Sequence, residues 1–169
     1  MNTPLPLTTV DQLIPTMQRQ GFSVLSAKDW PQLGVSAALL SELTSAWDRL
    51  CRDEYLKDGG RYRLRRHSCF VMRDGELSQT EHRAHFQPVE YNALHGGMRR
   101  WFEPMEPDVA AHPAWQNLLK RTAQMCSAVA PVGEAEDVWH IEAHQFRIDA
   151  TGGIGRPTPE GAHRDGVDF

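Results

Sequence analysis

An apolar stripe between residues 35 and 50 places the strongest constraint on how this chain folds. Its members recur at steps of three and four residues, which is the spacing of one face of an α-helix. The stripe consists of Val35, Ala38, Leu39, Leu43, Ala46, Trp47 and Leu50. A helix with such a face must bury it against another layer, so the pattern predicts a helix over 35–50 that lies on a sheet.

The segments that follow supply the strands of that sheet. "RYRLRRHSCFVM", the turn "RDGE" and "LSQTEHRAHFQ" read as two strands joined by a hairpin, because Asp-Gly is a strong signal for a tight turn. A short helix or two are predicted over 8–21, where Gly21 is the stop signal. Another helix is predicted over 112–129, where a proline stands near its first position, and a long strand is centred on "VWHIEAHQFRI". The arrangement indicates an α+β fold with helices against an antiparallel sheet.

Size and charge narrow the class of protein. The chain has 169 residues, 40% of them hydrophobic, which suits one globular domain spanning 1–169. With a formal net charge of −4, the chain has no global basic field, so we expect no nucleic-acid partner. Neither a spanning segment nor a signal peptide is evident, and we expect a cytoplasmic protein without a membrane partner; the sequence leaves a homodimer open.

The last residues contain a candidate metal-binding pair. In a strand, residues two apart point to the same side, so His163 and Asp165 would project together and Arg164 would face away. An imidazole and a carboxylate side by side suit a borderline divalent metal, and with one more histidine they form the facial triad of non-haem Fe(II) oxygenases. The tripeptide alone also fits a solvated surface turn, "HRDG".

The wider context favours the metal site. "HQFRIDATGGIGRPTPEGAHRDGVDF" resembles the bacterial 2-oxoglutarate/Fe(II) dioxygenase family that includes the free L-isoleucine hydroxylases. Upstream, "YLKDGGRYRLRRHSCF", "FQPVEYNALHGGMRRWFEP" and "VWHIEAHQFRI" are also similar to that family. The resemblance covers most of the chain from about Gly21 onward.

This resemblance implies N-terminal helices packed on a double-stranded β-helix, the cupin-like jelly roll. It implies Fe(II) held by His163 and Asp165, 2-oxoglutarate as cosubstrate, O2, and hydroxylation of a small molecule, in particular a free L-amino acid. In the family a second histidine and a 2-oxoglutarate-binding arginine follow the His-x-Asp motif. Neither residue type occurs between Asp165 and Phe169. A jelly roll needs about eight strands, and the patterns predict roughly five. We therefore expect the N-terminal part of a dioxygenase; a catalytically incomplete fragment or a non-catalytic binding module is the alternative.

Further polar residues are candidates for contacts with the substrate. Gln145 and Arg147 share one face of the strand before the glycine-rich loop, and Glu160 stands just ahead of the His-x-Asp motif. Arg147 could grip a carboxylate, although an ion pair with Asp149 or Glu160 is an equal alternative.

Two other polar groups have plain structural interpretations. The arginines of "RYRLRR" are interpreted as a solvated strand face or an anion-binding wall, in preference to a phosphate-binding stripe. No third metal ligand is assigned, because the remaining histidines are interpreted as packed or surface residues: His67, His82, His85, His95, His112, His140 and His144.

Overall fold

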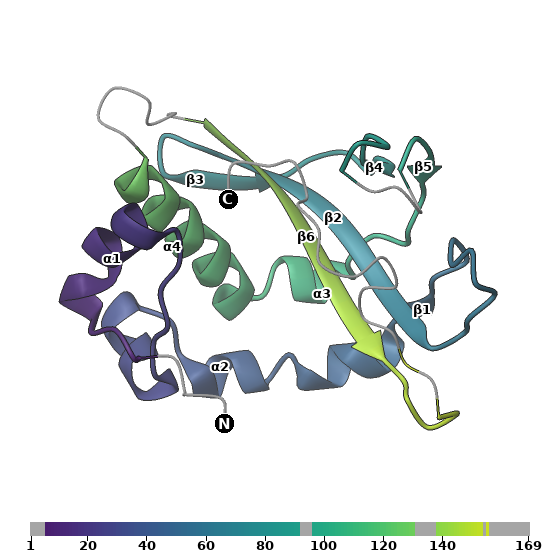
Figure 1. Cartoon of the computed structure of the whole chain (residues 1–169), viewed down its shortest axis with the longest axis horizontal. Coiled ribbons are helices and arrows are strands. Elements are labelled where there is room, and N and C mark those ends of the chain that lie inside the picture. Colours follow the sequence, from purple (N-terminus) through teal and green to yellow (C-terminus); the bar gives the residue numbers. More distant parts are fainter. Residues whose placement is uncertain (1–5, 92–95, 131–137, 154, 156–169) are drawn as a thin grey trace. The chain divides into compact units, whose positions relative to one another are not determined.

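The computed structural model describes residues 6–91, 96–130, 138–153 and 155. The chain forms two compact units. The first comprises Met1–Leu43, Val71–Ser78 and Asp108–Ile141, and the second comprises Thr44–Phe70, Gln79–Pro107 and Glu142–Phe169. Figure 1 labels the elements, and each unit is described by itself.

The first unit is built mainly from helices. A short 3-10 turn, Val10–Gln12, leads into α1 (Leu13–Gln20), which ends at Gly21, as the sequence predicts. Gly21 adopts a φ of 80° and donates its N–H to Met17 O, a left-handed helix end that glycine adopts without steric cost. Another 3-10 segment, Ala27–Leu33, precedes α2 (Ala37–Ser41).

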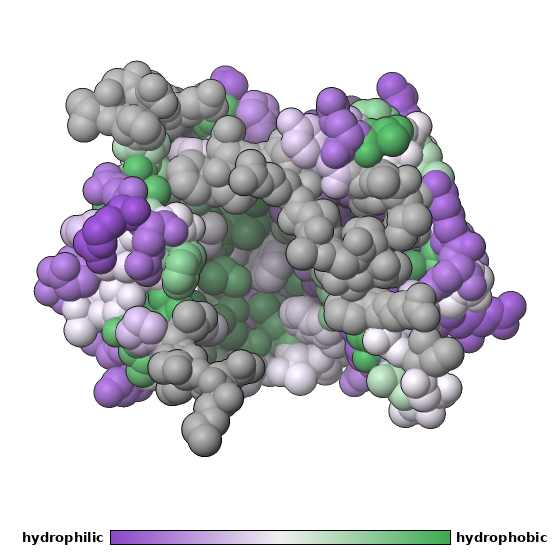
Figure 2. Space-filling model, in the orientation of Figure 1, coloured by the Kyte–Doolittle hydropathy of each residue, from purple (hydrophilic) through white to green (hydrophobic). Residues whose placement is uncertain are grey.

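The longest helix of this unit is α4 (Pro113–Val129), which lies beside α1 (Figure 1). Its predicted start is confirmed, because the side chain of His112 caps the helix by accepting from Ala114 N at 3.2 Å. Gln18 Nε2 of α1 donates to Ala128 O near the other end of α4 at 3.2 Å. The buried core includes apolar residues of both helices: Leu13, Ala114, Trp115, Leu119 and Ala123. The surface over α1 is largely hydrophilic (Figure 2), as expected for an amphipathic helix.

The prediction of one continuous helix over 35–50 is wrong. The segment instead contains α2 and a separate 3-10 helix, Thr44–Arg49. Ser36 Oγ caps the start of α2 by accepting from Leu39 N at 3.3 Å. At the other end of α2, Ser41 Oγ donates to Ala38 O at 2.6 Å, and such a local bond competes with the regular ladder of a helix and favours a break.

Antiparallel strands dominate the second unit. Strand β1 (Cys51–Arg52) pairs with β2 (Arg63–Arg73) in a register that sets Cys51 opposite Arg65. Strand β6 (Val138–Ile148) pairs with β2, and β4 (His85–Phe86) pairs with β5 (Arg99–Arg100) (Figure 1). The hydrophilic loop between β1 and β2 is visible in Figure 2.

The predicted hairpin is present. Strands β2 and β3 (Glu76–Gln79) are joined at Asp74 and Gly75, whose φ angles of 51° and 79° fit the tight turn that Asp-Gly favours. A four-residue helix, α3 (Pro107–Ala110), follows β5 in the chain.

Helices together with antiparallel strands confirm the α+β class. The jelly roll and the single domain over 1–169 stay predictions. Among the described residues, no helix has both the length and the apolar character that a membrane span requires.

Candidate metal centre

Alternation along two paired strands gathers polar side chains on one face of the sheet. On β2, the odd-numbered residues Arg63, Arg65 and His67 are all buried. On β6, Glu142 and His144 occupy alternate positions, with Ala143 buried between them. Because residues two apart share a face, each strand contributes a row of polar groups.

Three of these side chains, together with a histidine of β4, converge at one place in the second unit. The ligand atoms offered by His67, His85, Glu142 and His144 all lie within 4.8 Å of one another. His85 Nδ1 lies 2.7 Å from Glu142 Oε2, while His67 Nε2 and His144 Nε2 lie 3.9 Å and 3.8 Å from the same oxygen. We call these four residues the His/Glu cluster.

Burial and charge determine the protonation of the cluster. Burial of His67 lowers its pKa to about 3, with a further contribution from His144, so this ring is neutral at physiological pH. Burial also lowers the pKa of His144 to about 4. Burial of Glu142 would raise its pKa, but interactions with the nearby His144, His85 and His67 rings lower it overall, so this side chain is a carboxylate. Neutral imidazoles around one carboxylate are metal-binding forms of these groups.

Arg65 holds His144 in one orientation. Its Nη2 lies 2.6 Å from His144 Nδ1, and its guanidinium lies 3.8 Å and 4.4 Å from the ring centres of Phe102 and Phe146. Burial lowers the pKa of Arg65 to about 9, against the attraction of Asp53, and the group stays charged at neutral pH. Since an arginine can only donate, Nδ1 of His144 accepts, and the proton of the neutral ring is on Nε2.

A buried carboxylate holds the arginines of β2. Asp53 Oδ2 accepts a hydrogen bond from Arg63 Nε at 2.7 Å and lies 3.6 Å from Arg65 Nη1, and the Asp53 side chain is fully buried. Arg63 and Arg65 are about 5% exposed or less. The solvated strand face predicted for these two residues is therefore wrong, because a counterion ten residues earlier in the chain lets the strand bury them.

The residues that the sequence assigns to substrate and metal have different outcomes. His163, Asp165 and Glu160 lie outside the described residues. Gln145 is 1% exposed, and neither polar atom of its side chain has a hydrogen-bond partner among the residues described. Arg147 Nη1 donates to Asp48 Oδ1 at 2.9 Å, a partner other than the two that the sequence analysis suggested.

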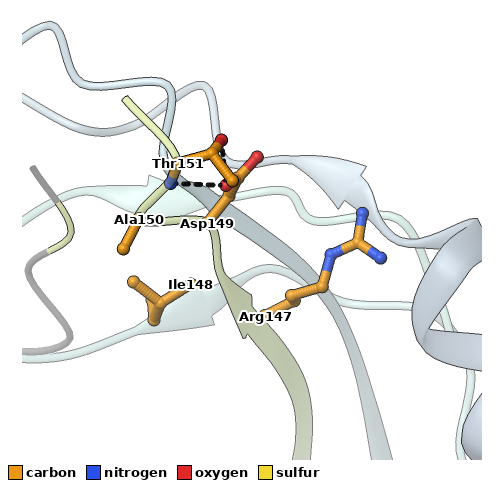
Figure 3. Close-up of a pocket in the computed structure, with 5 residues that line it drawn as sticks. All are labelled: Arg147, Ile148, Asp149, Ala150 and Thr151. Atoms are coloured by element: carbon orange, nitrogen blue, oxygen red, sulfur yellow. Dashed lines mark hydrogen bonds between the residues drawn. The ribbon is translucent and has the colours of Figure 1, made fainter. Parts of the chain in front are cut away.

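An open pocket of about 530 Å³ lies at the end of β6 and is lined by residues 147–151. Figure 3 shows Asp149 turned back onto Thr151, whose N and Oγ1 donate to Asp149 Oδ1 at 3.0 Å and 2.6 Å. The Arg147 side chain extends away from this turn. Arg147 is thus accessible to a ligand at the pocket while it keeps its bond to Asp48.

Comparison with known proteins gives the family. The model of the family described as "2OG-Fe dioxygenase" matches residues 44–169, which is most of the chain. The chain belongs to the 2OG-Fe dioxygenase family. Fe(II) and 2-oxoglutarate are the cofactor and cosubstrate of this family, in agreement with the expectation from the sequence. No curated protein matches.

Two solved structures are similar to this chain. A bsmA homolog from Methylobium petroleophilum PM1 is 44% identical, with a TM-score of 0.85 over 96% of this chain and 65% of that chain. IDO from Bacillus thuringiensis is 13% identical, with a TM-score of 0.59 over 86% of this chain and 57% of that chain, and this likeness concerns the fold alone. The chain thus spans about two thirds of the length of the first structure.

The described residues include donors that suit the family's metal. Imidazole nitrogens and a carboxylate oxygen are the ligand types that non-haem iron uses, and the His/Glu cluster supplies both. The sequence analysis missed this convergence, because it interpreted His67, His85 and His144 as packed or surface residues. The available signal was the alternation of His140, Glu142 and His144 along one strand face, combined with His67 on another strand.

Proposed function

We propose that this 2OG-Fe dioxygenase hydroxylates a small molecule, a free L-amino acid, with Fe(II) held by His163 and Asp165. The observation that carries the proposal is the family match over 44–169, which includes both residues. Bound Fe(II), 2-oxoglutarate and O2 supply the chemistry: one oxygen atom enters succinate as CO2 leaves, and the other enters a C–H bond of the substrate.

The chain's own polar residues would bind the two charged ends of an amino acid. Arg147 has five N–H donors and uses one nitrogen on Asp48, so it can still grip a carboxylate. The amide of Gln145 is buried without a partner in the described part of the chain, a costly state that a polar group of the substrate would relieve. Glu160 would complete the set by accepting from the ammonium.

The test is a screen of the twenty L-amino acids with Fe(II), ascorbate and 2-oxoglutarate, in which succinate and substrate hydroxylation are measured by mass spectrometry. One or a few amino acids are expected to stimulate succinate release in proportion to a product heavier by one oxygen atom. If 2-oxoglutarate and metal bind but no succinate forms with any compound, the chain is better explained as a non-catalytic binding module. If succinate forms without an amino-acid product, the substrate class is wrong.

We expect His163→Ala and Asp165→Ala each to weaken Mn(II) binding at the iron site by more than about 100-fold, since even the loss of a group that only orients a ligand costs 10- to 100-fold. Titration calorimetry with Mn(II) and 2-oxoglutarate measures the effect without O2 chemistry. Arg164→Ala is the matched control, because its side chain is predicted to face away and should leave the affinity within about twofold. Unchanged affinity in both ligand variants would end the assignment.

A further inference from the structure

The His/Glu cluster brings together more groups than its hydrogen bonds explain. Within the described residues, three imidazoles surround one carboxylate, yet only His85 Nδ1 is within hydrogen-bond distance of Glu142 Oε2. His67 Nε2 and His144 Nε2 stop 3.9 Å and 3.8 Å from that oxygen, beyond a hydrogen bond. His67 Nε2 has a weak hydrogen-bond contact with Cys69 Sγ at 3.5 Å, and the other ring nitrogen, Nδ1, is buried without a hydrogen-bond partner in the described part of the chain. A cation between Glu142 Oε2 and the imidazole nitrogens that face it would account for the convergence.

We infer that His67, His85 and Glu142 form a second divalent-metal site, made wholly from strands β2, β4 and β6 and sharing no ligand with the proposed iron site of His163 and Asp165. The inference goes beyond the proposed function and does not depend on it, because none of the three donors belongs to the His-x-Asp motif. Two imidazole nitrogens and one carboxylate oxygen suit zinc and neighbouring first-row divalent ions, with at least one coordination position left open.

The fourth member of the cluster has another role. The hydrogen bond from Arg65 occupies His144 Nδ1, so the proton of the neutral ring sits on Nε2, the nitrogen that faces Glu142. That nitrogen has no lone pair to give a metal. His144 instead contacts the donor rings, with its centre 4.6 Å from that of His67 and 4.8 Å from that of His85, and positions them.

The two distances from the histidine donors to Glu142 Oε2 require only a small adjustment to admit an ion. Bonds of about 2.0 to 2.1 Å in tetrahedral geometry set zinc ligands about 3.4 Å apart. His67 Nε2 and Glu142 Oε2 are 3.9 Å apart, so they need to approach by about half an ångström. His85 Nδ1 and the same oxygen are 2.7 Å apart and are joined by a hydrogen bond. To bind the metal, the His85 ring would take the neutral tautomer with its proton on Nε2, so that Nδ1 presents its lone pair to the ion and the two atoms move apart.

The experiment is a titration of the 169-residue chain with Zn(II) by calorimetry and with Co(II) by visible absorption, which reports the coordination sphere. The variant His163→Ala/Asp165→Ala, which lacks the proposed iron ligands, is expected to retain one bound metal. Adding His67→Ala or Glu142→Gln to it is expected to weaken that binding by more than about 100-fold. His140→Ala, at an exposed position two residues before Glu142 on the same strand, is the matched control and should bind as the parent does.

Each outcome is decisive. Glu142→Gln keeps the size of a partly exposed side chain, so it tests the site even if His67→Ala unfolds the protein, which circular dichroism would reveal. Loss of all metal in His163→Ala/Asp165→Ala would mean that only the iron site exists and would overturn the inference. Zn(II) affinity unchanged by Glu142→Gln and by His67→Ala would also overturn it. Failure of the proposed function, in contrast, shows as missing succinate with this second site intact.

Discussion

Replacing Asp53 with asparagine is expected to lower the free energy of unfolding by about 3 to 5 kcal/mol, because it leaves two buried guanidinium groups without their counterion. Asp53 is fully buried, receives a hydrogen bond from Arg63 at 2.7 Å, and lies 3.6 Å from Arg65. Its other oxygen accepts from Tyr55 N at 2.9 Å and fixes the chain after β1. Urea unfolding followed by circular dichroism measures the loss.

Asp48→Asn is the matched control for this prediction. Asp48 also pairs with an arginine, Arg147, at 2.9 Å, but its side chain is 79% exposed. Water and salt screen such a pair, so we expect its loss to cost less than about 1 kcal/mol. Equal effects of the two substitutions would show that Asp53 does not hold the buried arginines, and the buried-charge argument would fail.

Truncation of Phe70 to alanine is the second large effect, with an expected loss of about 3 to 5 kcal/mol. Phe70 lies on β2, is 0% exposed, and is the largest fully buried side chain among the described residues. Its removal loses the transfer free energy of the ring and leaves a cavity that close-packed neighbours fill only in part. The same urea titration applies, with Phe70→Leu expected to retain a large share of the stability.

Phe86→Ala provides the comparison at an exposed site. Phe86 lies on β4 and is 50% exposed, so most of its ring already contacts water, and we expect a loss below about 1 kcal/mol. If Phe70→Ala proved no more harmful than Phe86→Ala, the core around β2 would be able to collapse around the missing ring.

The sequence predicts the elements whose signals are local. Gly21 ends α1, Asp74 and Gly75 turn the β2–β3 hairpin, and Pro113 begins α4, each through a backbone preference of the residue itself. The break between α2 and Thr44–Arg49 was not predicted, because the apolar spacing is helical throughout and does not reveal the bond from Ser41 Oγ to Ala38 O at the end of α2.

The candidate site was harder to predict, because its members lie far apart in the sequence, on three different strands, and meet only in the folded chain. His67, His85 and Glu142 are separated by loops of unequal length, and a single sequence gives no register between their strands. The burial of Arg63 and Arg65 was likewise not predicted from the sequence. It depends on Asp53, which directly follows β1 and is placed beside the two arginines by the pairing of β1 with β2. By contrast, His163 and Asp165 lie two residues apart in one short segment, so the His-x-Asp motif and the resemblance of its surroundings to the family nominated them.

The two-residue repeat of β6 restricts how this segment can change. Glu142 and His144 project on one side of the strand, while the buried Ala143 and Gln145 project on the other. Inserting or deleting one residue ahead of Glu142 would exchange the two rows, driving a carboxylate and an imidazole into the interior and presenting a methyl group in their place. We therefore expect β6 to tolerate substitutions better than insertions or deletions, which are expected to be tolerated only in the flanking loops.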